Sequence, residues 1–136
     1  MKSIQGYYDK LSQDYDTQRS NPYFRLIEEL ELDVLRRYLP SSCERVLELG
    51  CGTGIFLEHL QGGDLSLHGL DYTAGMLELA REKLDVPLVA LVQGEGQTLP
   101  YADNSFDLVY SFKVLAHLAR IDWALSETRR VLRSDG

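Results

Sequence analysis

The spacing of hydrophobic positions along the chain changes near Glu44. Before that point, residues 23–39 carry apolar side chains at helical spacing, which predicts a helix between the Asn21-Pro22 breaker and Pro40. The apolar face of this helix is expected to comprise Phe24, Ile27, Leu30, Val34 and Leu35. Residues 3–16 mix aromatic side chains with polar ones and predict a shorter, earlier helix.

After Glu44, short apolar runs alternate with amphipathic stretches. The runs predict strands at 45–49, 65–71, 87–93 and 106–112, and the stretches predict helices at 55–60, 73–84 and 121–132. Such alternation indicates βαβ units, parallel pairing and right-handed crossovers. We therefore expect an α/β fold in which a ligand binds beyond the carboxyl ends of the strands, where the strand order reverses.

The unusual residues of the sequence fall at these strand ends. VLELGCGTG (46–54) closes the first strand with Glu48 and then a glycine-rich turn, Gly50 to Gly54, which lets a ligand approach bare backbone N–H groups. Asp71 closes the second strand, where a carboxylate can accept hydrogen bonds from a ribose diol. Gly94, Glu95 and Gly96 close the third strand and suit an adenine edge. Together they predict an adenosine-containing ligand with a charged tail.

The glycine spacing argues against a dinucleotide. The pattern G-x-G-x-x-G/A needs a small residue three positions after the second glycine, and the two available registers place Ile55 or Leu57 there. A phosphate loop of the G-x-x-x-x-G-K-[ST] type is absent from the sequence. The expected ligand therefore has a tail smaller than a pyrophosphate.

Composition narrows the function classes. The formal net charge of −7 disfavours a nucleic-acid partner. No apolar run reaches the roughly 18–20 residues of a membrane span, and the N-terminus has no apolar signal region, so we expect a cytoplasmic protein. Cys43 and Cys51 do not form a metal-ligand pattern, and no metal site is predicted.

Four motifs, in order and spacing, resemble those of class I S-adenosylmethionine-dependent methyltransferases. They are VLELGCGTG, LHGLDYTAGMLELAREK, QGEGQTLPYADNSFDLVYS and RVLRSDG. The likeness covers roughly residues 5–136 and is strongest to ubiquinone- and menaquinone-type methylases, the methyltransferase type 11 domain. It implies a Rossmann-like parallel sheet with flanking helices. The family sheet has seven strands and this chain supplies four, so the likeness implies a chain truncated after the fourth strand and its helix.

The resemblance also implies roles for individual residues. The loop from Gly50 through Cys51 and Gly52 to Gly54 would pass beneath the methionine part of S-adenosylmethionine, and Glu48 would order that loop. Asp71 would bind the ribose, with Tyr72 and Met76 flanking the adenine. Glu95 and Gly96 would lie at the adenine edge, and Phe112 near the methionine amino group. An N-terminal lid, residues 1–40, would bring Tyr7, Tyr8 or Tyr15 to the cofactor bound by residues 41–136.

Two functions stay open at this point. The first is methyl transfer to a small or lipophilic acceptor, with His117 as a candidate general base and an equally good candidate for a packing or solvent-facing residue. The second is a non-catalytic binding module that lacks a complete acceptor site. A bare edge at the fourth strand would also favour association between copies of the chain. Glu28, Glu29 and Glu31 are interpreted as a solvated helix face, and Trp123 as a residue that packs its helix on the sheet.

Overall fold

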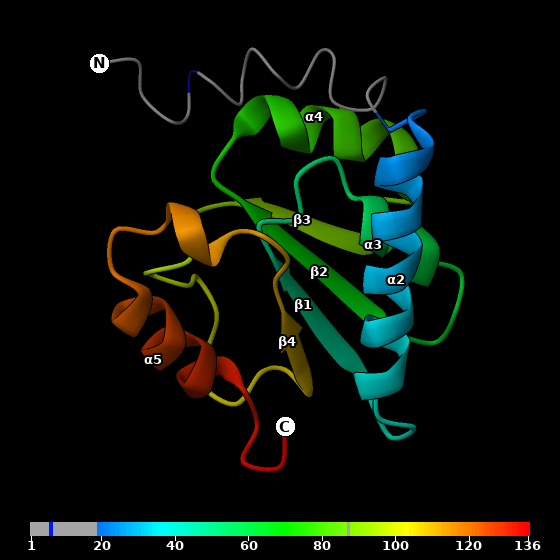
Figure 1. The fold of residues 1–136 in the computed structure, drawn as a ribbon. Coiled ribbons are helices and arrows are strands. Elements are labelled where there is room, and N and C mark those ends of the chain that lie inside the picture. The colour runs from blue at the N-terminus through cyan, green and yellow to red at the C-terminus, as the bar shows by residue number, and fades with distance from the viewer. Residues whose placement is uncertain (1–5, 7–18, 87) are drawn as a thin grey trace.

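A parallel β-sheet organises the chain. The computed structural model describes Gly6, residues 19–86 and residues 88–136. In these residues, four strands alternate with helices (Figure 1) as β1 (Arg45–Leu49), α3 (Ile55–Leu60), β2 (Ser66–Asp71), α4 (Ala74–Lys83), β3 (Val89–Gln93) and β4 (Leu108–Tyr110), followed by a short 3₁₀ turn η1 (Leu115–His117) and α5 (Ile121–Val131). The predicted α/β, Rossmann-like fold class is confirmed.

The strand order locates the ligand crevice. The strands lie in the order β3-β2-β1-β4, and every neighbouring pair is parallel. The chain moves outward from β1 to β3 and then returns to place β4 on the other side of β1. The order therefore reverses between β1 and β4, and open α/β sheets bind ligands beyond the carboxyl ends of the strands at such a point.

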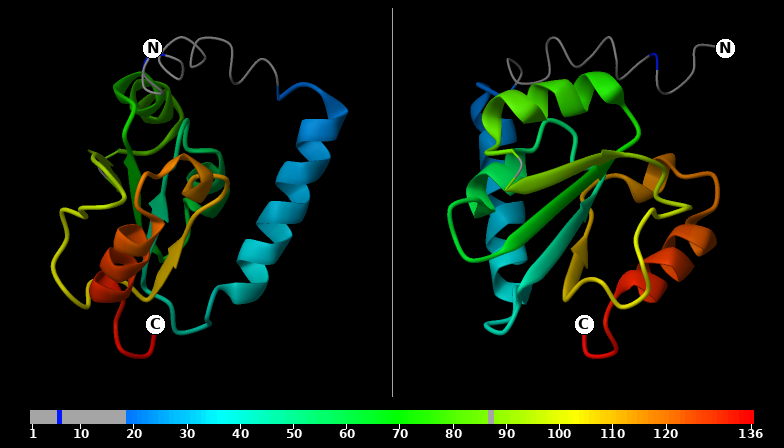
Figure 2. Two further views of the ribbon diagram at one scale, coloured as in Figure 1. Left: turned by 60° about the vertical axis from the view of Figure 1, so that its left-hand side comes forward. Right: turned by 180° about the vertical axis from the view of Figure 1, so that it is seen from behind.

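Helices cover both faces of the sheet. On one face, side chains of β1, β2 and β3 pack against α3 and α4, with Val46, Leu57, Leu67 and Leu77 almost fully buried. On the other face, Leu47 and Leu70 pack with Phe106 and with Val131 of α5. The turned views in Figure 2 show α5 on one side of the sheet and α2 (Pro22–Tyr38) on the other. Burial on both faces explains why the strands read as continuous apolar runs.

Helix α2 begins where the sequence predicts, but its buried face differs from the prediction. Asn21 caps the helix by accepting the Tyr23 N–H, and Pro22 occupies the first turn. Leu32 and Leu35 are buried against Phe56, whereas Leu30 and Val34 of the predicted face are 59% and 47% exposed. The helix has apolar residues on more than one side, so spacing alone does not identify the packed side.

Two further expectations about packing are wrong. Trp123 is 54% exposed, and the Arg120 guanidinium lies over its ring, 4.4 Å from the centroid. Strand β4 extends over three residues instead of seven, and among the described residues it pairs only with β1. Phe106, the first residue of the predicted strand, pairs instead with the end of α5, because its N–H donates to the Val131 carbonyl at 3.0 Å.

Candidate functional site

The three glycines after β1 share a backbone conformation that favours glycine, and two of them also make room for neighbouring side chains. All have positive φ, at +71° for Gly50, +53° for Gly52 and +80° for Gly54, a backbone region that costs other residues roughly 1–2 kcal/mol. A Cβ on Gly50 would lie 2.1 Å from a Val114 methyl, and a Cβ on Gly54 would lie 2.8 Å from Leu84. A Cβ on Gly52 would meet nothing within 4 Å. The missing Cβ atoms at Gly50 and Gly54 therefore leave room for Val114 and Leu84 of the protein itself, whereas Gly52 faces open space.

Asp71 connects this loop to the end of β2. One carboxylate oxygen accepts the Gly52 N–H at 2.9 Å, and the other accepts the Thr73 N–H at 2.8 Å. Burial raises the pKa of Asp71, and hydrogen bonds from the backbone N–H groups of Thr73, Gly52 and Tyr72 and from the Thr73 side chain oppose that rise. The carboxylate therefore holds the loop and borders the cavity, where a ligand diol can approach it.

Glu48 lies beneath the loop and is 2% exposed. It stands opposite Tyr110 in the β1–β4 register, and the Tyr110 hydroxyl donates to Glu48 Oε2 at 2.9 Å. Burial raises the pKa of Glu48 well above its ordinary value; the Tyr110 hydrogen bond opposes this, and the charge of Asp71 adds to it. The position of Glu48 in the strand is fixed by register, and its carboxyl group borders the crevice.

Cys51 is a packing residue of the loop. Its side chain is buried in the core beside Leu57 and Leu77. Burial raises the pKa of its thiol well above the ordinary value, and the nearby charges of Glu48 and Asp71 raise it further. A thiol in such surroundings stays neutral and is a poor nucleophile.

A cavity of about 950 Å³ lies over the carboxyl ends of the strands. This volume is at the upper end of the range typical for small-molecule sites. The predicted site residues that line it come from all four strand ends, from α4 and from η1: Glu48, Gly50, Cys51, Gly52, Asp71, Tyr72, Met76, Glu95, Gly96, Phe112 and His117. Gly54 is not among the lining residues, because it is buried against Leu84. Tyr7, Tyr8 and Tyr15 lie outside the described residues.

The cavity has a second wall that the sequence did not indicate as part of the site. This wall consists of Phe24, Glu28 and Glu31 of α2 and of Arg19, which precedes the helix. Arg19 donates to both oxygens of Glu28, at 2.7 and 3.1 Å, and Lys113 Nζ lies 3.0 Å from Glu31. The side chains of Glu28 and Glu31 are only 18% and 20% exposed, so the solvated-face interpretation is wrong for these two. Glu28 and Glu31 are three residues apart, which places them on one side of a helix. This spacing is the feature of the sequence that could have indicated their shared position in the wall.

Apolar side chains form much of the wall near η1. Phe112 stacks on Phe56 with ring centroids 4.6 Å apart, and Val114, Leu115 and Leu118 complete this side. Ser111 donates its hydroxyl to the Leu49 carbonyl at 3.0 Å, which ties the end of β4 to the end of β1. Val114 was missed because its sequence context carries no distinctive motif. In the described residues, no cluster of three or more His, Cys, Asp or Glu residues could hold a metal ion.

The fold and the position of the site define an α/β domain with a nucleoside-sized cavity at its topological switch point. Within that class, the chain belongs to the methyltransferase domain family, whose family model matches residues 47–136. This confirms the resemblance to S-adenosylmethionine-dependent methyltransferases carried by the four sequence motifs.

Individual relatives resemble the chain over nearly its whole length. An uncharacterised protein of Methanocaldococcus jannaschii is 33% identical over 133 residues, covering 98% of this chain and 49% of the relative. The demethylmenaquinone methyltransferase of Geobacillus kaustophilus is 31% identical over 135 residues, covering 95% and 58%. The crystal structure of an S-adenosylmethionine-dependent methyltransferase from Thermotoga maritima has a TM-score of 0.78 at 24% identity, covering 96% and 57%. The chain spans about half the length of these relatives.

None of the helices in the described ranges is both long and apolar enough to cross a bilayer.

Proposed function

We propose that the cavity binds S-adenosylmethionine and that the protein transfers its methyl group to a small or lipophilic acceptor. The observation that carries this proposal is the arrangement of Asp71 around the open position at Gly52. The carboxylate lines the cavity beside the loop that it holds, and the backbone at Gly52 leaves room for a ligand. A ribose diol is the group that fits such a carboxylate.

The other strand ends suit the remaining parts of the same molecule. Tyr72 and Met76 both line the cavity beside Asp71, where they would flank an adenine, and Glu95 and Gly96 lie at the next strand end. Glu48 and Phe112 lie on the opposite side of Asp71, where the amino-acid end would lie. Ile55 also lines the cavity, and its bulk at the position that dinucleotide sites keep small favours a ligand without pyrophosphate.

S-adenosylmethionine supplies an activated methyl group, so the residues of the chain have to align an acceptor and exclude water. Phe56, Phe112 and Leu118 present an apolar wall that suits a lipophilic or aromatic acceptor. The Geobacillus kaustophilus relative is named for an acceptor of this kind, demethylmenaquinone. His117 borders the same wall from η1 and is exposed, so its imidazole is placed to take a proton from an acceptor hydroxyl.

Calorimetric titration with S-adenosylhomocysteine and with NADH tests the cofactor assignment. We expect binding of the first ligand and none of the second, and NADH binding alone would overturn the proposal. A methyl-transfer screen over quinols, phenols and small amines then tests catalysis, with His117→Asn as the variant. We expect turnover of at least one aromatic hydroxyl acceptor and a lower rate in the variant at unchanged cofactor affinity.

A non-catalytic binding module is the second candidate. Cofactor binding without turnover of any acceptor would support this candidate. Association between copies through the open edge of β4 is a separate proposal, and sedimentation analysis of the purified chain tests it.

A further inference from the structure

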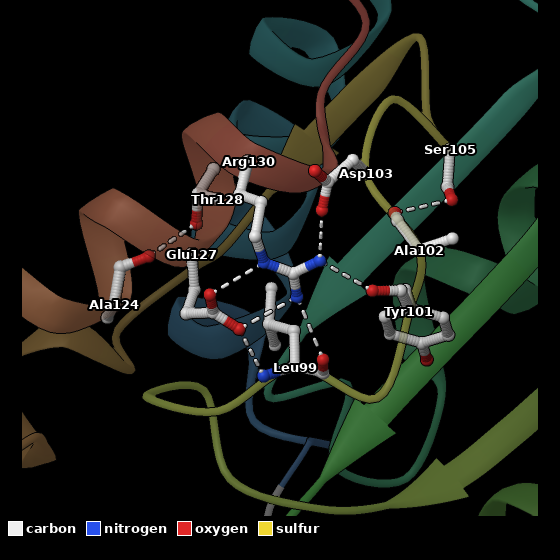
Figure 3. A network of polar contacts seen from close by, with 9 residues as sticks. All are labelled: Leu99, Tyr101, Ala102, Asp103, Ser105, Ala124, Glu127, Thr128 and Arg130. Atoms are coloured by element: carbon white, nitrogen blue, oxygen red, sulfur yellow. Dashed lines mark hydrogen bonds and ion pairs between the residues drawn. The ribbon is translucent and has the colours of Figure 1, made fainter.

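A polar clamp holds the loop between β3 and β4 against α5. The Arg130 guanidinium donates to the backbone carbonyls of Leu99 and Tyr101, at 3.0 and 2.8 Å, and to the Asp103 carboxylate at 2.8 Å. It also donates to both oxygens of Glu127, at 2.7 and 2.9 Å. Figure 3 shows the guanidinium between α5 and this loop. All three guanidinium nitrogens are therefore bonded.

Glu127 completes the clamp from the same helix. Its Oε2 accepts the Leu99 N–H at 2.8 Å, so both backbone groups of Leu99 are bound by α5 side chains. Arg130, as the largest contributor, lowers the pKa of Glu127 to about 2, so the carboxylate is charged at neutral pH. The Leu99 side chain is itself buried among Leu47, Leu70 and Phe106.

The clamped residue directly follows the tight turn at the third strand end. The Thr98 N–H donates to the Glu95 carbonyl at 3.1 Å and closes residues 95–98 into a turn. Upstream, the Gly94 N–H donates to the Asp71 carbonyl at 3.0 Å. Downstream, α5 holds Leu99, and the Arg120 N–H at the start of α5 donates to the Gln97 side chain at 2.6 Å. The turn is thus fixed to β2 at one end and to α5 at the other.

Arg130 and Glu127 do not themselves line the main cavity, whereas Glu95, Gly96 and Gln97 of the turn do. We propose that Arg130 and Glu127 are positioning residues that hold turn 95–98 in the shape that binds the nucleoside part of the cofactor. This inference rests on the proposed function, because it assigns the turn to the adenine end of S-adenosylmethionine. Without the clamp, the turn would have to be ordered at the moment of binding, and ordering backbone opposes binding.

The test compares Arg130→Gln with Arg129→Gln. Arg129 is an exposed neighbour on the same helix, so the control makes the same change of side chain and charge away from the loop. Affinity is measured by calorimetry for S-adenosylhomocysteine and for 5′-methylthioadenosine, which has the same nucleoside without the amino-acid end. The temperature is one at which circular dichroism shows each variant to be folded.

We expect Arg130→Gln to weaken both ligands by the same factor of about ten, the cost of ordering roughly one backbone residue, and Arg129→Gln to change neither. Arg130→Lys keeps the charge without the planar fork and should restore little of the affinity. If folded Arg130→Gln binds both ligands as tightly as the parent protein does, the inference is overturned. A loss confined to S-adenosylhomocysteine would also overturn it, because the clamp would then act on the amino-acid end.

Amide hydrogen exchange of the ligand-free protein separates this inference from the proposed function. In Arg130→Gln the amides of residues 95–99 should exchange faster, while those of β1 and β2 stay protected. If the parent protein binds neither ligand, the proposed function fails, and unchanged exchange at residues 95–99 would overturn the clamp independently. Should Arg130→Gln fail to fold, Glu127→Gln provides the same comparison, with a smaller expected loss of about threefold because its amide oxygen can still accept the Leu99 N–H.

Discussion

Replacing Asp71 by asparagine tests how one side chain serves both the loop and the ligand. The two carboxylate oxygens accept the N–H groups of Gly52 and Thr73 at 2.9 and 2.8 Å. An asparagine has one oxygen and one NH₂ group, so in either orientation one backbone N–H faces another donor. The same substitution removes an acceptor for one ribose hydroxyl.

The structure gives the expected size of both effects. An unpaired buried donor costs about 1–3 kcal/mol. The substitution also removes a charge that burial disfavours, since burial raises the pKa of Asp71. We therefore expect a stability loss at the lower end of that range, about 1 kcal/mol. A lost hydrogen bond from the ribose of about 1–3 kcal/mol weakens S-adenosylhomocysteine by about 5- to 150-fold. The loss of affinity should therefore exceed the loss of stability.

Calorimetry measures the affinity, and urea unfolding measures the stability. Asp64→Asn is the matched control, because Asp64 is exposed in the turn after α3 and loses the same charge. The control should leave both quantities unchanged. A folded Asp71→Asn protein that binds S-adenosylhomocysteine as tightly as the parent would refute the assignment of Asp71 to the ribose.

Three further predictions concern the glycine loop and the buried carboxyl group of Glu48. Gly52→Ala and its control Gly62→Ala both introduce a side chain at positive φ with nothing within 4 Å, so each should cost about 1 kcal/mol of stability. Only Gly52 lines the cavity, so only Gly52→Ala should weaken cofactor binding in calorimetry. Equal cofactor affinities of the two variants would contradict this. Because the pKa of Glu48 is raised in the folded protein, the unfolding free energy of the parent should fall as pH rises above about 4.5, until the raised pKa is passed. Urea unfolding at several pH values should show that Glu48→Gln lacks this pH-dependent loss of stability. Identical pH profiles of the parent and the variant would contradict the raised pKa. Tyr110→Phe removes the hydroxyl that donates to Glu48 and should lower stability at neutral pH by about 1–3 kcal/mol in the same assay, but by much less in a Glu48→Leu background, which has no acceptor. An equal loss in both backgrounds would show that the hydrogen bond is not the cause.

Much of the fold could be predicted because local pattern and tertiary environment agree in the sheet. The strand at 45–49 has the predicted limits, and Asp71 ends β2 as expected. Buried parallel strands are apolar throughout, and each is followed by a turn that only certain residues allow. The signals for these elements lie within a few neighbouring residues.

The parts that could not be predicted depend on contacts between distant residues. The packed side of α2 is decided by Phe56 and the end of β4, so its own spacing left the face open. Glu28 and Glu31 resemble any charged helix surface until Arg19 and Lys113 are seen to pair with them. Likewise, nothing near Arg130 in the sequence shows that it binds the backbone of residues 99–101.

The central claim is that the crevice over the strand ends holds a sulfonium nucleoside with its ribose on Asp71. A crystal structure of the protein with S-adenosylhomocysteine tests it most directly. We expect the ligand to lie in the cavity, with both ribose hydroxyls donating to the Asp71 carboxylate and the adenine beside turn 95–98. A ligand bound in the cavity with its ribose away from Asp71, or bound elsewhere on the protein, would contradict it.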